Sequence, residues 1–114
     1  MKEYTLDATD QTLGRLSSKV AHLVRGKGEA AYAPNLVPNV RVNIINASKV
    51  SFPTHRKSET IKRFSGYPGG LTQETRGHYV TRRGMKALME LTIKGMLPRN
   101  THRDILMKHI TITL

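Results

Sequence analysis

Apolar residues recur along the chain with two periods, one typical of helices and one typical of strands. Between about Thr12 and Arg25 they fall on one face of a helix, at every third or fourth position. Thr9, Asp10 or Thr12 can cap the start of this helix, and Gly26 can end it. The predicted buried face consists of Leu13, Leu16, Val20, Leu23 and Val24, and the opposite face of Arg15, Lys19 and His22.

A second helical pattern extends from about Thr81 to Leu97, and Pro98 ends it. Its inner face carries Met85, Leu88, Met89 and Met96, and its outer face carries Arg83, Lys86, Glu90 and Lys94. Asn100 can cap a short third helix that reaches about Lys108.

Strand patterns lie between the predicted helices. We predict strands over Tyr4–Asp7, Val40–Asn46 and His109–Leu114, with an edge strand over Thr60–Ser65. Gly66–Gly70 (GYPGG) indicates a turn. Helices that alternate with strands favour an α/β layered fold, and a length of 114 residues suits one domain over residues 1–114.

The charge of the chain is strongly unbalanced. It contains 19 Lys and Arg against 8 Asp and Glu, a net charge of +11. Self-repulsion of this size destabilises a compact state unless an anionic partner neutralises it. Nucleic acid is therefore favoured over a protein that is basic only for solubility and over a membrane-surface protein, since the charge is not confined to one amphipathic helix.

Catalytic and metal-binding patterns are not found. There is no cysteine, the five histidines are scattered, and the carboxylates are too sparse for paired acid–base work. We expect no enzyme, no cofactor, no metal and no small-molecule substrate. No apolar segment is long enough to span a membrane, and the first ten residues resemble neither a secretory signal nor an Arg-rich transit peptide. A cytoplasmic location is expected, with an organellar one less favoured.

The basic residues form two dense segments. Between Arg41 and Arg63 there are six Lys and Arg against one acid, and between Arg76 and Lys108 there are eight against two. Charge on helix faces and in loops suits a folded RNA that surrounds the protein better than a DNA groove, which usually takes one element. Because aromatic residues are few, we expect phosphate and shape contacts to dominate over base stacking. The candidate RNA-binding residues in these segments include Arg56, Arg63, Arg82, Arg83, Lys86, Arg103 and Lys108.

Two other classes of function stay open at this point. A strand followed by a helix with Gly14 near its start weakly suggests a dinucleotide site, but the fingerprint needs three glycines. The GYPGG turn could bind a phosphate of a nucleotide through its backbone amides, although an ordinary tight turn is favoured. A free-standing DNA- or RNA-binding regulator is the second alternative.

Several motifs occur together in one order. They are DATDQTLGRLSSKVAHLVRGK (7–27), Tyr32-Ala33-Pro34, INASKV (45–50), SGYPGG (65–70) and IKGMLPRN (93–100). In this order and spacing they resemble the bacterial-type large-subunit ribosomal protein L-thirteen family over nearly the whole chain. In this chain, Phe64 stands where that family usually has His, and Thr101-His102-Arg103 replaces the common Leu-Gly-Arg.

The resemblance implies a fold and a partner. The expected fold is a three-layer α/β/α domain with a small, mainly parallel sheet. The expected function is structural: binding of large-subunit ribosomal RNA, early entry into subunit assembly, and contact with neighbouring ribosomal proteins. By position, the implied RNA-contacting residues are Arg15, Lys19, Arg25, Lys27, Lys57, Lys62, Tyr67, Lys94 and Arg99, with Gly66, Gly69 and Gly70 shaping the loop.

Overall fold

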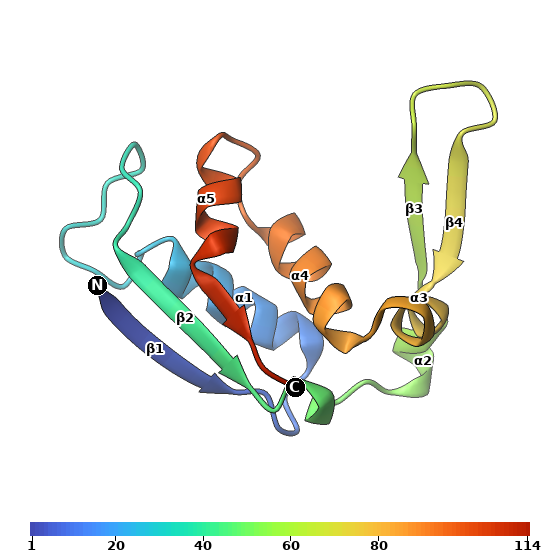
Figure 1. The fold of residues 1–114 in the computed structure, drawn as a ribbon, viewed down its shortest axis with the longest axis horizontal. Helices are drawn as coiled ribbons and strands as arrows, with labels where there is room; N and C mark the ends of the chain where they lie inside the picture. Colours follow the sequence, from blue (N-terminus) through green and yellow to red (C-terminus); the bar gives the residue numbers. More distant parts are fainter.

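A three-stranded parallel sheet forms the centre of the fold. The computed structural model describes all residues 1–114. Strand β1 (Lys2–Asp7) pairs with β2 (Val40–Ile45), and β2 pairs with β5 (Ile110–Ile112), so that β2 is the middle strand (Figure 1). The predicted α/β class and the small, mainly parallel sheet are confirmed.

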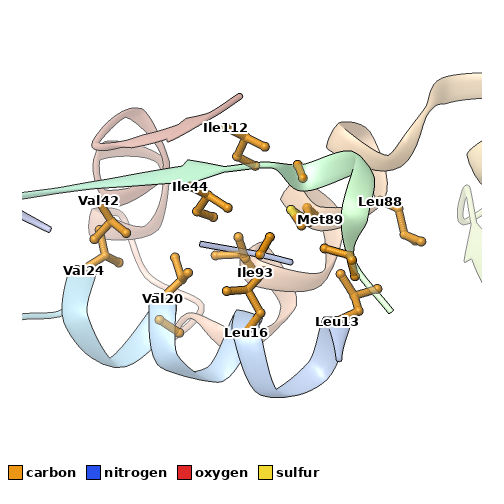
Figure 2. Close-up of a cluster of buried hydrophobic side chains, with 14 of the residues drawn as sticks. Leu13, Leu16, Val20, Val24, Val42, Ile44, Leu88, Met89, Ile93 and Ile112 are labelled. Carbon is orange, nitrogen blue, oxygen red and sulfur yellow. The ribbon is translucent and has the colours of Figure 1, made fainter. Parts of the chain in front are cut away.

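The main helices cover one face of this sheet. Helix α1 (Leu13–Val24) packs against α4 (Met85–Met96) and against β2, and α5 (His102–Lys108) continues the helical side next to β5. Apolar side chains from α1, β2 and α4 point toward one another between the helices and the sheet (Figure 2). The fully buried centre of this core includes Leu16, Val20, Val24, Val42, Ile44, Leu88, Met89 and Ile93.

The opposite face of the sheet is open. Along β2 the side chains alternate, with Val40, Val42 and Ile44 buried and Arg41 and Ile45 exposed. Alternation of this kind is typical of a sheet with one face on the core and one toward solvent. Residues 1–114 therefore form two of the three predicted layers, the sheet and the helices on one of its faces.

The middle of the chain forms an arm beside this body. It contains a 3₁₀ turn (η1, Ala47–Lys49), a short helix α2 (Thr54–Lys57), the antiparallel strands β3 (Thr60–Phe64) and β4 (Leu71–Thr75), and helix α3 (Arg76–Arg83). The β3–β4 hairpin extends away from the rest of the molecule (Figure 1). The molecule is flat, with principal extents of 45 × 36 × 18 Å.

The predicted helix over Thr81–Leu97 is wrong in its boundaries. The structure has two helices there, α3 and α4, separated by Gly84 with a φ of 93°. A positive φ breaks the helical backbone, and glycine adopts it without a Cβ penalty. The start of α3 lies earlier than predicted because Thr75 caps it: the backbone N–H of His78 donates to the Thr75 hydroxyl at 3.2 Å.

Smaller differences also have physical causes. Strand β4 was not predicted because Leu71–Thr75 has one apolar residue and pairs only through its contact with β3. Met96, assigned to the buried face, is 40% exposed, whereas Ile93 is fully buried. The last strand ends at Ile112, and Asn46 lies beyond β2 in a left-handed conformation with a φ of 57°.

The core predicts a large effect of truncation at Leu16. Leu16 is fully buried, and we expect Leu16→Ala to lower the free energy of unfolding by about 2–5 kcal/mol through lost contacts and a residual cavity. The matched control is Leu36→Ala, since Leu36 is 62% exposed and its truncation should change stability by at most about 0.5 kcal/mol. Urea denaturation of the two variants measures both values, and equal losses would contradict this description of the core.

Candidate nucleic-acid interface

Most carboxylates of the chain are held in ion pairs at joints between elements. Glu3 pairs with Arg41, Glu29 with Lys2, and Asp104 with Lys94, at N–O distances of 3.5, 2.5 and 3.7 Å. Glu59 pairs with Arg56 and Arg76, and Glu74 pairs with Arg63 and Arg82. Seven of the 19 Lys and Arg side chains therefore form ion pairs within the molecule, with five carboxylates between them.

Twelve Lys and Arg side chains have no carboxylate partner. Eleven of them are among the candidate RNA-binding residues from the sequence, and the twelfth, Lys49, was missed. Conversely, Arg56, Arg63, Arg82 and Lys94 were predicted as RNA-binding and are paired in the structure. The eleven are Arg15, Lys19, Arg25, Lys27, Lys57, Lys62, Arg83, Lys86, Arg99, Arg103 and Lys108.

A cleft gathers cations from three separate parts of the chain. It lies between the exposed face of α1, the segment 51–56 and the start of α3, with a volume of about 810 Å³. Arg15 and Lys19 reach it because positions four apart lie on one side of a helix. Arg56 and Arg76 line the same cleft from the arm. The structure thus brings together three predicted residues from motifs distant in the sequence.

Glu59 is the one acid that lines this cleft, and it holds the two arm arginines. Arg56 donates to Glu59 Oε1 at 2.6 Å, and Arg76 lies 3.0 Å from Glu59 Oε2. The hydrogen bond from Arg56, followed by the positive charges of Arg76 and Arg56, keeps the pKa of Glu59 below its ordinary value despite partial burial. Two guanidinium groups shared by one carboxylate leave a net positive charge in the cleft.

Sequence reasoning missed two cleft residues. Arg76 and His55 line the cleft but were not candidates. Arg76 follows Thr75 directly, and recognition of Thr75 as a helix cap would have placed Arg76 on the first turn of a helix. No signal in the sequence distinguished His55 from the four other histidines.

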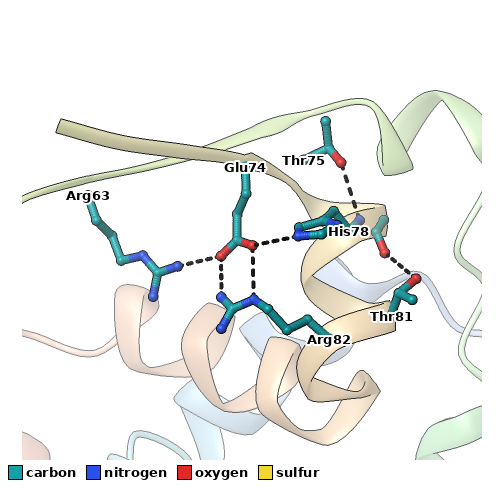
Figure 3. A network of polar contacts seen from close by, with 7 residues as sticks. Arg63, Glu74, Thr75, His78, Thr81 and Arg82 are labelled. Atoms are coloured by element: carbon teal, nitrogen blue, oxygen red, sulfur yellow. Dashed lines mark hydrogen bonds and ion pairs between the residues drawn. The ribbon is translucent and has the colours of Figure 1, made fainter.

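The side of the hairpin that faces α3 carries an ion-pair network. Arg63 from β3 and Arg82 from α3 converge on Glu74 of β4, whose side chain is only 10% exposed (Figure 3). Arg82 binds through two bonds, from Nη2 to Oε1 at 2.6 Å and from Nε to Oε2 at 3.3 Å. His78 Nε2 lies 3.8 Å from Oε2. Both arginines also lie over the ring of Tyr79, at 5.8 and 5.6 Å from its centre.

The glycines of the SGYPGG motif shape the tip of the hairpin. Gly66 and Gly69 have φ values of 90° and 74°, and a Cβ on Gly70 would lie 1.9 Å from the Ser65 hydroxyl. The turn joins two strands, and no helix follows it directly. A nucleotide-binding loop uses backbone amides at the start of a helix, so this arrangement favours the ordinary turn. The sequence expectation that these glycines shape a loop agrees with their conformations.

The remaining candidates are spread over other surfaces. Arg25 lines a separate apolar pocket with Tyr32 and Leu36, and Lys108 lies with Glu90 and Met107 beside another depression. Lys57 packs its side chain against Gly77. The structure therefore groups only part of the predicted set, and cations cover several sides of the molecule.

None of the helices is both long and apolar enough to cross a membrane. No three His, Cys, Asp or Glu side chains come together as a metal site would require.

Comparison with known proteins shows the family of this chain. The family model described as ribosomal protein L13 matches residues 1–112. The large ribosomal subunit protein uL13 of Lactobacillus delbrueckii subsp. bulgaricus is 40% identical over 112 residues, which cover 96% of this chain and 76% of that protein. The protein of the same name from Listeria welshimeri is 45% identical over 101 residues, 88% of this chain and 69% of that protein.

The chain belongs to the ribosomal protein L13 family. The family assigned from the motifs is thereby confirmed. Its members are structural ribosomal proteins and not enzymes, in agreement with the expectation from the sequence.

The network at Glu74 predicts a pH dependence of stability. Hydrogen bonds from Arg82, and then the charges of Arg82 and Arg63, lower the pKa of Glu74 from its ordinary 4.5 despite its burial. Such a carboxyl stabilises the fold above its unfolded pKa and loses this contribution as the pH falls through its folded pKa. We expect the free energy of unfolding to fall as the pH is lowered past the unfolded value of 4.5 toward the lower folded pKa, and less steeply in Glu74→Gln.

The control for this prediction is Glu90→Gln. Glu90 is exposed and has no ion-pair partner, so its replacement should leave the slope of stability against pH unchanged. Urea denaturation at several pH values gives both slopes. If Glu74→Gln kept the slope of the parent chain, the ion pairs at Glu74 would contribute nothing to folding.

Proposed function

We propose that this chain is a structural component of the large ribosomal subunit and that it binds and stabilises the ribosomal RNA of that subunit. Its mechanism is neutralisation of phosphate charge on several sides of a small domain formed by residues 1–114. The name of its relatives, large ribosomal subunit protein, supports the first part. The distribution of cations supports the second.

The observation that carries the proposal is the cleft shared by α1 and the arm. It places Arg15, Lys19, Arg56 and Arg76 around one depression with a single carboxylate. Guanidinium and ammonium groups in this arrangement bind phosphate oxygens through charge-assisted hydrogen bonds. A flat molecule 18 Å thick, with free cations elsewhere on its surface, suits RNA segments that pack against more than one side.

The proposed role extends to the assembly of the large subunit. The bound RNA neutralises the self-repulsion of the protein, and the protein in turn holds RNA segments together. We propose that this chain enters subunit assembly early and contacts neighbouring ribosomal proteins. The bacterial relatives support a place in cytoplasmic ribosomes.

The two alternative classes predict different observations. A nucleotide-binding enzyme would show a thermal shift with a mononucleotide, and we expect none, since the glycine-rich turn joins two strands. A free-standing regulator would be found outside ribosomes. Sedimentation of cell extract should show the chain with the large subunit through moderate salt, and a free pool alone would contradict the proposal.

The cleft predicts a specific change in salt dependence. Binding of in-vitro-transcribed large-subunit ribosomal RNA should weaken steeply with salt because counterions are released from phosphates. In the double variant Arg15→Ala, Lys19→Ala, affinity should fall, and the slope of log K against log salt should decrease by about one for each lost phosphate contact. Filter binding at several salt concentrations measures both quantities.

The matched control is Arg41→Ala. Arg41 lies on the open face of the sheet and pairs with Glu3, so its loss should change affinity and slope little. The proposal would be contradicted by an affinity of the parent chain that is flat with salt. An equal effect of the control and the cleft variant would remove the cleft from the interface.

A further inference from the structure

The tip of the hairpin exposes large apolar side chains. Phe64 is 68% exposed, Tyr67 is 75% exposed and Leu71 is 53% exposed. The chain has only six aromatic residues, and the two most exposed lie within four positions of each other at this tip. Apolar side chains that cluster on a projecting element mark a contact surface.

Strand register shows which residues share the apolar face. Phe64 pairs with Leu71, Lys62 pairs with Gln73, and Thr60 pairs with Thr75. Because side chains alternate along a strand and cross-strand partners share a face, these six residues lie on one side of the hairpin. We call this side the outer face. Ile61, Arg63 and Glu74 belong to the other side, which the ion-pair network holds against α3.

The polar groups of the outer face differ from those of the side that faces α3. It carries one cation, Lys62, one amide, Gln73, and no carboxylate, since Glu74 points to the other side. Lys62 has no ion-pair partner. An aromatic ring next to a free ammonium group and an amide matches a nucleotide, which offers a flat base, a phosphate and polar base edges.

We propose that the outer face and tip of the hairpin bind unpaired bases of ribosomal RNA, with Phe64 and Tyr67 stacking on the bases and Lys62 next to a phosphate. This inference rests on the proposed function and adds base stacking to its phosphate contacts. It departs from the expectation, based on the few aromatic residues, that stacking contributes little. The number of aromatic residues is low, but their placement concentrates them at one exposed site.

Hydrogen bonds at both ends of the hairpin order the backbone that carries these rings. At the tip, Gly70 N–H donates to the Tyr67 carbonyl at 2.9 Å, and Ser65 N–H donates to the Gly70 carbonyl at 3.3 Å. At the base, Arg76 N–H donates to the Glu59 carbonyl at 2.8 Å, and Glu74 fixes β4 to α3. A platform that is already ordered loses little conformational entropy when a base stacks on it.

A tryptophan reporter tests stacking directly. The chain contains no tryptophan, so Phe64→Trp introduces a single indole at the proposed site. We expect its fluorescence to be quenched when in-vitro-transcribed large-subunit ribosomal RNA is added, because a stacked base is in direct contact with the ring. The matched control is Leu36→Trp, at a 62% exposed position in the 27–39 segment away from the hairpin, which should bind equally and show little quenching.

Affinity measurements separate stacking from general apolar contact. Phe64→Ala should weaken binding of the same RNA about 5- to 150-fold, the range found for loss of one base–aromatic stack, without changing the salt slope. Phe64→Tyr should restore binding, and Phe64→Leu should not, since leucine is apolar but has no flat ring. Lys62→Ala should instead reduce the slope of log K against log salt by about one.

The outcomes distinguish this inference from the proposed function. If the parent chain does not bind the RNA at all, the proposed function itself fails. If the parent chain binds but Phe64→Ala binds equally well and Phe64→Trp is not quenched, only the stacking inference is overturned. It is also overturned if Phe64→Leu binds as well as Phe64→Tyr, or if Phe64→Ala keeps full RNA affinity but loses contact with a ribosomal protein in purified subunits.

Discussion

The scarcity of carboxylates is the constraint on which this structure depends. The chain has eight Asp and Glu against 19 Lys and Arg. Five of these eight carboxylates form ion pairs that link separate segments of the chain. Glu29 ties the 27–39 segment to β1 through Lys2 and the Tyr4 hydroxyl, and Glu74 ties the hairpin to α3. Exposed ion pairs contribute only about 0–1 kcal/mol each, so they fix geometry more than they offset the repulsion of the twelve free cations.

The molecule is a flat plate around a single apolar core. One apolar core lies between the sheet and the helices, while the arm has few buried side chains, and Glu59 and Glu74 hold its own elements to one another. A plate 18 Å thick has a large surface for its length, and such a surface buries less apolar area per residue than a sphere would. Stability and binding are therefore linked, because a polyanion that packs around the plate removes repulsion that the core must otherwise overcome.

Helices and strands with regularly spaced apolar residues could be predicted from the sequence. Elements whose bounds depend on a single residue or on a tertiary contact could not. Helix α1 and strand β2 follow from regular apolar spacing, and both lie close to their predicted bounds. The break at Gly84 depends on one positive φ, and β4 exists because β3 lies beside it. The candidate site shows the same limit: charge identified the cations, but only the fold shows that Arg63 and Arg82 share Glu74 while Arg15 and Lys19 remain free.

The hairpin illustrates how one short element can serve both stability and recognition. In β3, side chains of alternate residues point to opposite sides, so Arg63 can pair with Glu74 on the side that faces α3 while Lys62 and Phe64 stay free. A shift of register by one residue would exchange these roles, burying Lys62 against α3 and exposing Arg63. The glycines at 66, 69 and 70 set the turn that fixes this register. The same turn, whose place between two strands favours an ordinary turn over a nucleotide loop, thus determines which side chains the hairpin offers to a partner.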